Sequence, residues 1–266
     1  MLQIITIGNI DIDMYNALNY VGIAALYLWA ISQRRPFSEI CPQARRQTSE
    51  KKKLLVSAAV FCGLTLAGLL LLLVLNQKFG DWFTDGNKNY YGSLTAWLIA
   101  FPVLTSFLKI PPLRALDLLT PGLPMSLAIS KLACVCYGCC YSFEMPGSFY
   151  YNICTNRCEF PVQMVEAAVA FLIFVFLLWY RKRTYREGTL FPLYVAVYSV
   201  SRFLTEFLRA DLPDVLGGFD AYQIMSVVYL IIGLLLFMAV RKYGGRIRVN
   251  LGPIGQILRK NPRGKS

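Results

Sequence analysis

Three charged residues interrupt an apolar stretch in the C-terminal half of the chain. Arg202, Glu206 and Arg209 follow Tyr198 at spacings of four, four and three residues. On a helix, these spacings place all four side chains on one face. Charges near hydrocarbon are costly unless they face a bundle interior or a wet cavity, where they tend to mark a functional site. This face suits an anionic lipid head group; the alternative is a structural pair of Glu206 with Arg209.

A second polar face begins the preceding apolar segment. Pro161 suits the first turn of a helix, and Gln163 and Glu166 then share one face of it. We expect this face to point inward, with Glu166 paired to Arg202 or to Lys131 around a polar pocket. The alternative is a protonated Glu166 that only hydrogen-bonds a neighbouring helix. Lys131 lies deep enough in its own apolar segment that we also expect an interior partner for it.

Six of the eight cysteines lie between residues 134 and 158, at Cys134, Cys136, Cys139, Cys140, Cys154 and Cys158. Disulfides could link Cys139 or Cys140 to Cys154 or Cys158, because the cluster is expected outside the cytoplasm. The thiols could instead stay free. A third arrangement is a zinc site of Cys136, Cys139, Cys154 and Cys158, since CxxC followed by CxxxC resembles zinc-ligand spacing. We assign no metal ligand and no cofactor.

The cysteines also bear on reactivity. Lys131 precedes the cluster, and a nearby cation favours the reactive thiolate, so Cys139 is a candidate nucleophile. The CxxC of Cys136 and Cys139 could alternatively serve thiol redox chemistry, although it lacks a thioredoxin-like context. The chain contains no histidine. Proton transfer would therefore fall to Glu206, Glu166, a cysteine or a tyrosine.

The elements that must position these residues are apolar helices. The 266 residues are 56% hydrophobic and 16% charged, which predicts an all-α integral membrane protein. We expect one transmembrane domain with seven spans, near residues 14–32, 54–76, 91–108, 113–141, 161–180, 189–208 and 221–240. The fourth span contains Pro121, Gly122 and Pro124, which predict a break or kink. No removable signal peptide is expected.

The charges predict the orientation of these spans. The net charge is +12, and most basic residues lie in the loops after the first, fifth and seventh spans. This is the positive-inside pattern rather than a nucleic-acid-binding stripe, so we expect no nucleic-acid partner. It places the N-terminus outside and the C-terminus in the cytoplasm. The basic tail, 242–266, either rests on anionic lipid or is simply solvated.

Several stretches together resemble the bacterial prolipoprotein diacylglyceryl transferase family, over roughly residues 90–240. The family's C-terminal pattern of aromatic, Gly, two residues, Arg-Phe, two residues, Glu-Phe, one residue and Arg is similar to Tyr198, Arg202, Phe203, Glu206, Phe207 and Arg209. Its His-Pro-x-Gln-Leu-Tyr-Glu resembles FPVQMVE, which keeps Pro161, Gln163 and Glu166 but has Phe160 for His. Its Gln-x-x-Ser matches Gln223 and Ser226. The resemblance implies the same seven-span layout.

The chain departs from the family pattern at two motifs. The family's His-Gly-Gly, which holds its base, stands here as Tyr91, Gly92 and Ser93. Its Gly-Arg-x-Gly-Asn-Phe-x-Asn-Gly-Glu is replaced by SKLACVCYGC, in which Lys131 stands for the Arg and Cys139 for the Glu. A divergent branch with Gly-Cys-Cys-Tyr-Gly is more similar to residues 138–142, and the chain is identified as a member of that branch.

The resemblance implies a transferase in the bacterial cell membrane. It would move diacylglyceryl from phosphatidylglycerol, or another anionic phospholipid, to the thiol of a lipobox cysteine in an exported precursor protein. Such a reaction needs cations for the departing phosphate and a base near the thiol. The implied catalytic residues are Arg202, Glu206, Lys131, Tyr91 and Cys139. The implied substrate-binding residues are Arg209, Glu166, Gln163, Tyr198, Gly92 and Gln223. The alternative is a non-catalytic lipid or lipoprotein-binding relative that keeps the anion pocket and has lost the base.

Overall fold

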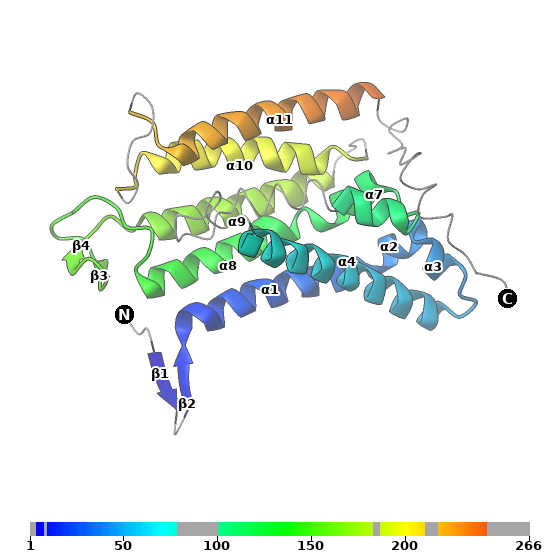
Figure 1. Ribbon diagram of the computed structural model, residues 1–266, viewed down its shortest axis with the longest axis horizontal. Helices are drawn as coiled ribbons and strands as arrows, with labels where there is room; N and C mark the ends of the chain where they lie inside the picture. The colour runs from blue at the N-terminus through cyan, green and yellow to red at the C-terminus, as the bar shows by residue number, and fades with distance from the viewer. Residues whose placement is uncertain (1–3, 8–9, 79–100, 183–186, 211–217, 244–266) are drawn as a thin grey trace.

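The computed structural model describes residues 4–7, 10–78, 101–182, 187–210 and 218–243. These residues form mostly α-helices that lie side by side (Figure 1). Three of the described helical stretches are long and apolar enough to cross a membrane, namely Pro112–Tyr137, Val162–Arg181 and Ala221–Tyr243. The chain is therefore a mostly helical membrane protein.

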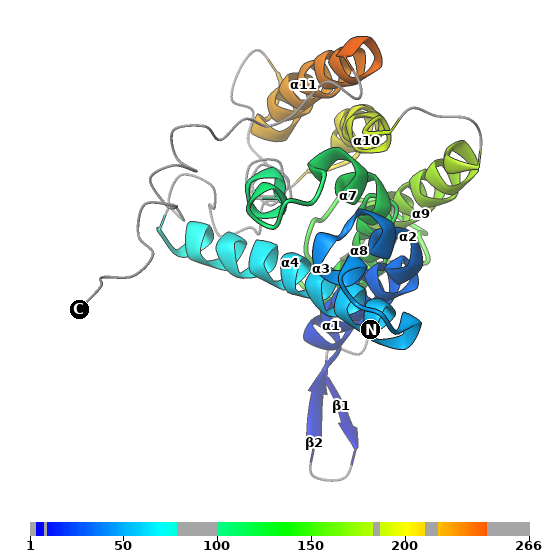
Figure 2. The same ribbon diagram turned by 90° about the vertical axis from the view of Figure 1, so that its right-hand side faces the viewer.

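The N-terminal part consists of a hairpin followed by two long helices. Strands β1 (Ile4–Ile7) and β2 (Ile10–Asp13) pair antiparallel and point away from the bundle (Figure 2). Helix α1 (Met14–Ser32) begins at Asp13, whose carboxylate accepts a hydrogen bond from the Tyr15 N–H and caps the helix. The basic loop after it folds into α2 (Arg34–Ile40) and α3 (Pro42–Arg45), and α4 (Glu50–Lys78) follows.

The expected break in the fourth apolar segment is confirmed. The segment consists of α7 (Pro112–Leu119) and α8 (Gly122–Tyr137), separated at Thr120 and Pro121. The Trp29 indole N–H donates to the Leu118 carbonyl (2.9 Å), which satisfies one carbonyl group beside the break. A Cβ at Gly122 would lie 2.7 Å from the Trp29 ring, so glycine allows α8 to start against α1.

Helices α9 (Val162–Arg181), α10 (Leu190–Glu206) and α11 (Ala221–Tyr243) complete the bundle. Helices that pack against each other follow the order α1, α8, α9, α10, α11. Figures 1 and 2 both show α11 at one edge of the bundle. Gly233 brings α11 against α10, because a Cβ there would lie 2.9 Å from the Ala196 nitrogen. The carboxylate of buried Asp117 accepts hydrogen bonds from the Gly188 and Leu190 N–H groups, which fixes the start of α10.

The structure corrects three details of the expected layout. The chain is not purely helical, because two short hairpins form, the second from β3 (Tyr151–Asn152) and β4 (Arg157–Cys158). The fourth segment stops being helical at Tyr137 rather than at residue 141, because Gly138 ends it in the left-handed conformation (φ +84°). Helix α10 ends at Glu206, so Arg209 lies beyond it. Of the third expected span, 91–108, residues 91–100 lie outside the described part.

Candidate active site

Glu166 joins two cations from two other helices. Its Oε2 lies 2.6 Å from the Lys131 Nζ of α8, and its Oε1 accepts a hydrogen bond from the Arg202 Nη1 of α10. Both pairings proposed from the sequence are therefore confirmed, and they occur together. The Glu166 and Arg202 side chains are almost fully buried. Breaking such a pair strands a charge away from water, which is strongly unfavourable.

Glu206 extends the same network toward the end of α10. Its two carboxylate oxygens lie 2.7 Å from the Arg202 Nη2 and 3.3 Å from the Arg209 Nε. Arg209 reaches Glu206 from outside the helix because the chain turns after Glu206. There the Ala210 N–H donates to the Tyr141 carbonyl (3.2 Å) instead of continuing the helix. The assumption that all four residues share one helix face is thus wrong for Arg209, although its pairing with Glu206 holds.

The site has an excess of positive charge. Lys131, Arg202 and Arg209 contribute three cations and Glu166 and Glu206 two carboxylates, a formal net charge of +1. These five side chains are at most 15% exposed. In such a poorly solvated site, a net positive charge attracts an anion more strongly than it would in water. Fixed guanidinium groups also suit phosphate, which they grip through several N–H donors.

Tyr222 lies beside both arginines. The Cζ atoms of Arg202 and Arg209 are 5.3 and 5.9 Å from the centre of its ring, within the range of cation–π attraction. The sequence analysis did not select this residue, although its neighbour Gln223 was selected. Gln223 instead helps to cap α11: its N–H donates to the Asp220 carboxylate (2.8 Å), and its side chain accepts from the Asp220 N–H (3.1 Å).

A small cavity lies at the network and shares part of its wall with an apolar groove. The cavity, of about 20 Å³, is lined by Lys131, Glu166 and Arg202, together with Tyr198. Since a water molecule needs about 10–15 Å³ measured in this way, the cavity has room for about one water. The groove, of about 690 Å³, lies along α9, α10 and α11. Cavity and groove share the lining residues Val169, Ile173, Ser201 and Thr205. An apolar chain in the groove would therefore end beside the cations.

Gln163 connects this network to the turn after α8 that carries Cys139 and Cys140, called the cysteine turn below. Its side-chain N–H donates to the Cys139 carbonyl (2.8 Å) and to the Tyr150 hydroxyl (3.4 Å). It lies one turn before Glu166 on α9, so the two residues point to the same side of that helix. The six clustered cysteines are all free thiols, which overturns the disulfide arrangement for this structure. The thiols that meet are those of Cys134, Cys139 and Cys140 rather than the four of the alternative zinc arrangement.

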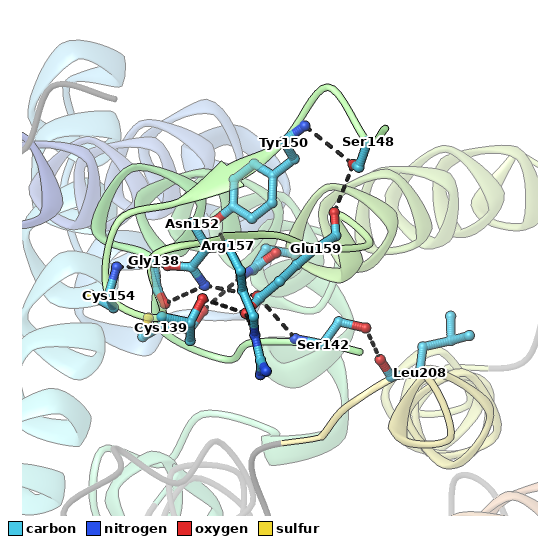
Figure 3. Close-up of polar contacts among 12 residues, drawn as sticks. Gly138, Cys139, Ser142, Ser148, Tyr150, Asn152, Cys154, Arg157, Glu159 and Leu208 are labelled. Atoms are coloured by element: carbon cyan, nitrogen blue, oxygen red, sulfur yellow. Dashed lines mark hydrogen bonds and ion pairs between the residues drawn. The ribbon is translucent and has the colours of Figure 1, made fainter. Parts of the chain in front are cut away.

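Glu159 organises the loop that follows the cysteines. Its side chain is fully buried and accepts hydrogen bonds from the Asn152 side chain (2.9 Å), the Ser142 N–H (3.3 Å), Arg157 (3.1 Å) and Thr155, most of which Figure 3 shows. Burial raises the pKa of this carboxyl, but the hydrogen bonds outweigh it and hold the pKa below its usual value. The sequence analysis did not single out Glu159.

The same loop attaches the cysteine turn to the end of α10. The Ser142 hydroxyl donates to the Leu208 carbonyl, as Figure 3 shows, and residues 142 and 209 form an isolated β-bridge. Asn152 donates to the Gly138 carbonyl (3.0 Å). The loop therefore connects the end of α8 to the segment that carries Arg209. The expected site residues Tyr91 and Gly92 lie outside the described residues.

Similarity to known proteins identifies the family of this chain. The model of the family described as prolipoprotein diacylglyceryl transferase matches residues 3–239. This chain belongs to that family. It is 28% identical over 176 residues to the phosphatidylglycerol--prolipoprotein diacylglyceryl transferase 2 of Clostridium perfringens, a match that covers 64% of this chain and 66% of the relative.

Two further relatives are named phosphatidylglycerol--prolipoprotein diacylglyceryl transferase. The Clostridium tetani protein is 32% identical, over 47% of this chain and 53% of its own length. A Dehalococcoides mccartyi protein (strain BAV1) is 22% identical, over 88% of this chain and 91% of its own. The match thus covers about two thirds of the length of the Clostridium perfringens protein and about half of that of the Clostridium tetani protein. It covers most of the Dehalococcoides mccartyi protein. The names of these relatives give phosphatidylglycerol and a prolipoprotein as their substrates.

Proposed function

We propose that this protein transfers a diacylglyceryl group from phosphatidylglycerol, or a related anionic phospholipid, to a cysteine thiol of an exported lipoprotein precursor. The observation that most supports this is that the cavity lined by the buried cations shares a wall with an apolar groove. A phospholipid has a negative phosphate directly attached to its two apolar chains. Acyl chains in the groove along α9, α10 and α11 would place the phosphate beside Lys131 and Arg202, to which Arg209 is joined through Glu206.

Each side chain has a role in the proposed reaction. The acceptor thiol gives up its proton to solvent, the thiolate sulfur attacks the glyceryl carbon that bears the phosphate oxygen, the C–O bond breaks, and glycerol phosphate leaves with the electron pair. Arg202, Arg209 and Lys131 hold the departing phosphate, and Glu166 and Glu206 orient these cations. Gln163 joins the site to the cysteine turn, and Tyr198 lines the cavity. Tyr91, Gly92 and Gln223 remain candidate contacts for the substrates.

The proposal includes a cellular location and an arrangement of the spans in the membrane. The protein would be a single domain of seven spans in the bacterial cell membrane, with the N-terminus outside and the tail 242–266 in the cytoplasm. The placement of the basic loops supports this orientation. It puts the cysteine turn, Glu206 and Arg209 toward the outer leaflet, where an exported precursor would present its lipobox cysteine.

Transfer of label tests the function. The full chain in detergent–lipid micelles is mixed with phosphatidylglycerol labelled in its diacylglyceryl part and with a lipobox peptide. We expect labelled peptide when its acceptor is cysteine and none when that cysteine is replaced by serine, with release of one glycerol phosphate for each peptide modified. Binding of phosphatidylglycerol without any transfer, under reducing and oxidising conditions alike, would contradict the proposal and identify a lipid-binding relative instead.

A further inference from the structure

Three thiols converge next to the cationic site. The sulfur atoms of Cys134, Cys139 and Cys140 all lie within 4.8 Å of one another, and the three residues are half-buried. Zinc–thiolate bonds of about 2.3 Å in a tetrahedral arrangement place sulfur atoms about 3.8 Å apart. A small inward movement of the three side chains would therefore suffice to bind one ion. Partial exposure leaves a path by which the ion can enter.

The backbone is built to bring these thiols together. Gly138 ends α8 in the left-handed conformation, and its N–H donates to the Cys134 carbonyl (2.9 Å). Cys140 also has a positive φ, of 58°, which is costly for a residue with a side chain. The two turns fold Cys139 and Cys140 back toward Cys134. Hydrogen bonds from Gln163 to the Cys139 carbonyl and from Asn152 to the Gly138 carbonyl hold this conformation.

The surrounding charge suits a metal–thiolate centre. Three thiolates around one divalent ion carry a formal charge of −1, and the adjoining network of cations and carboxylates carries +1. Lys131 lies one helical turn before Cys134 on the same face of α8. Thiolates prefer soft or borderline ions such as Zn²⁺ over Mg²⁺ or Ca²⁺. The neighbouring cations would thus balance the charge that the thiolates bring.

We propose that Cys134, Cys139 and Cys140 bind one thiophilic metal ion, Zn²⁺ being the simplest case, whose fourth ligand is the thiolate of the acceptor cysteine. This differs from the sequence analysis, which assigned no metal ligand. Three protein ligands with one open position are typical of catalytic rather than structural zinc. The role of the fourth ligand rests on the proposed transferase function, whereas the three-thiolate site does not.

The centre would take over the role that a histidine base plays elsewhere. With no histidine in the sequence, the acceptor thiol needs another means of losing its proton. Metal coordination does this, because a bound thiol is deprotonated and its proton passes to solvent. The bound sulfur then forms the C–S bond with the glyceryl carbon while the C–O bond to the phosphate breaks. The electron pair departs with glycerol phosphate, next to Arg202 and Lys131.

Metal content tests the three-thiolate site. Full chain purified under reducing conditions and dialysed against Zn²⁺ is expected to hold one Zn²⁺ by elemental analysis. Loading with Co²⁺ is expected to give sulfur-to-cobalt charge-transfer absorption. Cys134→Ser should lose both signals. Cys136→Ser, a cysteine on the same helix but outside the three, should keep them. Wild type without stoichiometric metal, or equal loss in both variants, would overturn the site.

A second measurement tests the fourth ligand separately from the transfer reaction. A lipobox peptide added to the Co²⁺-loaded chain, without phospholipid, should increase the charge-transfer absorption, and the matching serine peptide should not. An unchanged spectrum with the cysteine peptide would overturn the acceptor role. If the spectrum changes but no diacylglyceryl reaches the peptide when phosphatidylglycerol is added, the metal site and its fourth ligand are supported and the proposed function fails. Transfer that is unaffected by chelation would overturn the metal's role and leave the function standing.

Discussion

At the scale of single residues, Glu166 is the contact that holds Lys131 and Arg202 together. Its two oxygens pair with cations from α8 and α10. Glu166 itself lies on α9, which packs between these two helices. Without it, the two positive charges would repel each other in a poorly solvated interior. The carboxylate therefore keeps both cations in place, and in the proposed reaction the phosphate would meet them already positioned.

This role predicts energetic coupling between Glu166 and Lys131. Lys131→Met leaves the Glu166 Oε2 without its 2.6 Å partner, so the free energy of unfolding should fall by about 3 kcal/mol. In a Glu166→Gln background, the same change should cost much less. Chemical unfolding in mixed micelles measures both, with Lys53→Met as the control because its pair with Glu50 is exposed and worth little. Additive effects of the two substitutions would show that the pair is not coupled.

At the scale of elements, the turn after α8 depends on glycine at residue 138. Gly138→Ala should destabilise the protein, because φ of +84° is strained for alanine and its Cβ would meet the Asn152 Oδ1 at 2.4 Å. Gly147→Ala is a matched control with the same φ and no atom within 4 Å. The strain alone costs about 1–2 kcal/mol, so the thermal midpoint should fall further for residue 138 than for residue 147. Equal shifts would mean that the contact with Asn152 is unimportant.

The loop from residue 142 to residue 160 should lose stability in acid. The pKa of Glu159 is below its usual value, so its hydrogen bonds contribute fully above the unfolded pKa of a glutamate, about 4.3, and are lost as the pH falls through the lower folded pKa. Wild type should therefore melt at a lower temperature below about pH 4 than at pH 6. Glu159→Gln should be less stable at pH 6 and lose less on acidification. Parallel pH profiles of the two proteins would contradict this.

The sequence predicted helices and their inward faces better than it predicted irregular backbone. Lys131, Glu166, Arg202 and Glu206 could be found because buried charges in apolar segments are rare and helical spacing fixes their direction. Arg209, Cys139 and Cys140 lie where the chain leaves the helix, and there spacing no longer determines position. The zinc set that CxxC spacing offered as one alternative does not form for this reason, since positive φ at Gly138 and Cys140 decides which sulfurs meet.

Two residues of the site had weaker signals in the sequence. Tyr222 stands in an ordinary apolar helix start, and its contact with both arginines depends on how α10 and α11 pack. Glu159 is one acid among several in the chain, and only the fold of the loop between α8 and α9 makes it a fully buried acceptor. Local patterns therefore identify the charged network, whereas tertiary packing supplies its aromatic and loop partners.

At the scale of the whole molecule, the groove along α9, α10 and α11 predicts where the lipid enters. Val200→Trp would fill the groove, so KM for phosphatidylglycerol should rise several-fold while KM for the peptide changes little. Val227→Trp on α11 is a matched control, since both valines are 44% exposed and Val227 does not line the groove. Transfer kinetics at varied lipid concentration measure both. An equal effect of the two tryptophans would place the lipid elsewhere.

The role of the buried cations in transfer is measured by comparing wild type with Arg202→Ala under identical conditions, with the diacylglyceryl peptide quantified by mass spectrometry. Arg202 contacts both Glu166 and Glu206, and its loss should lower the transfer rate on the order of 100-fold to 1,000-fold. Arg181→Ala, which removes an arginine bonded to Gln33 at the other end of α9, should stay close to wild type. Undiminished transfer by a folded Arg202→Ala protein would contradict the account.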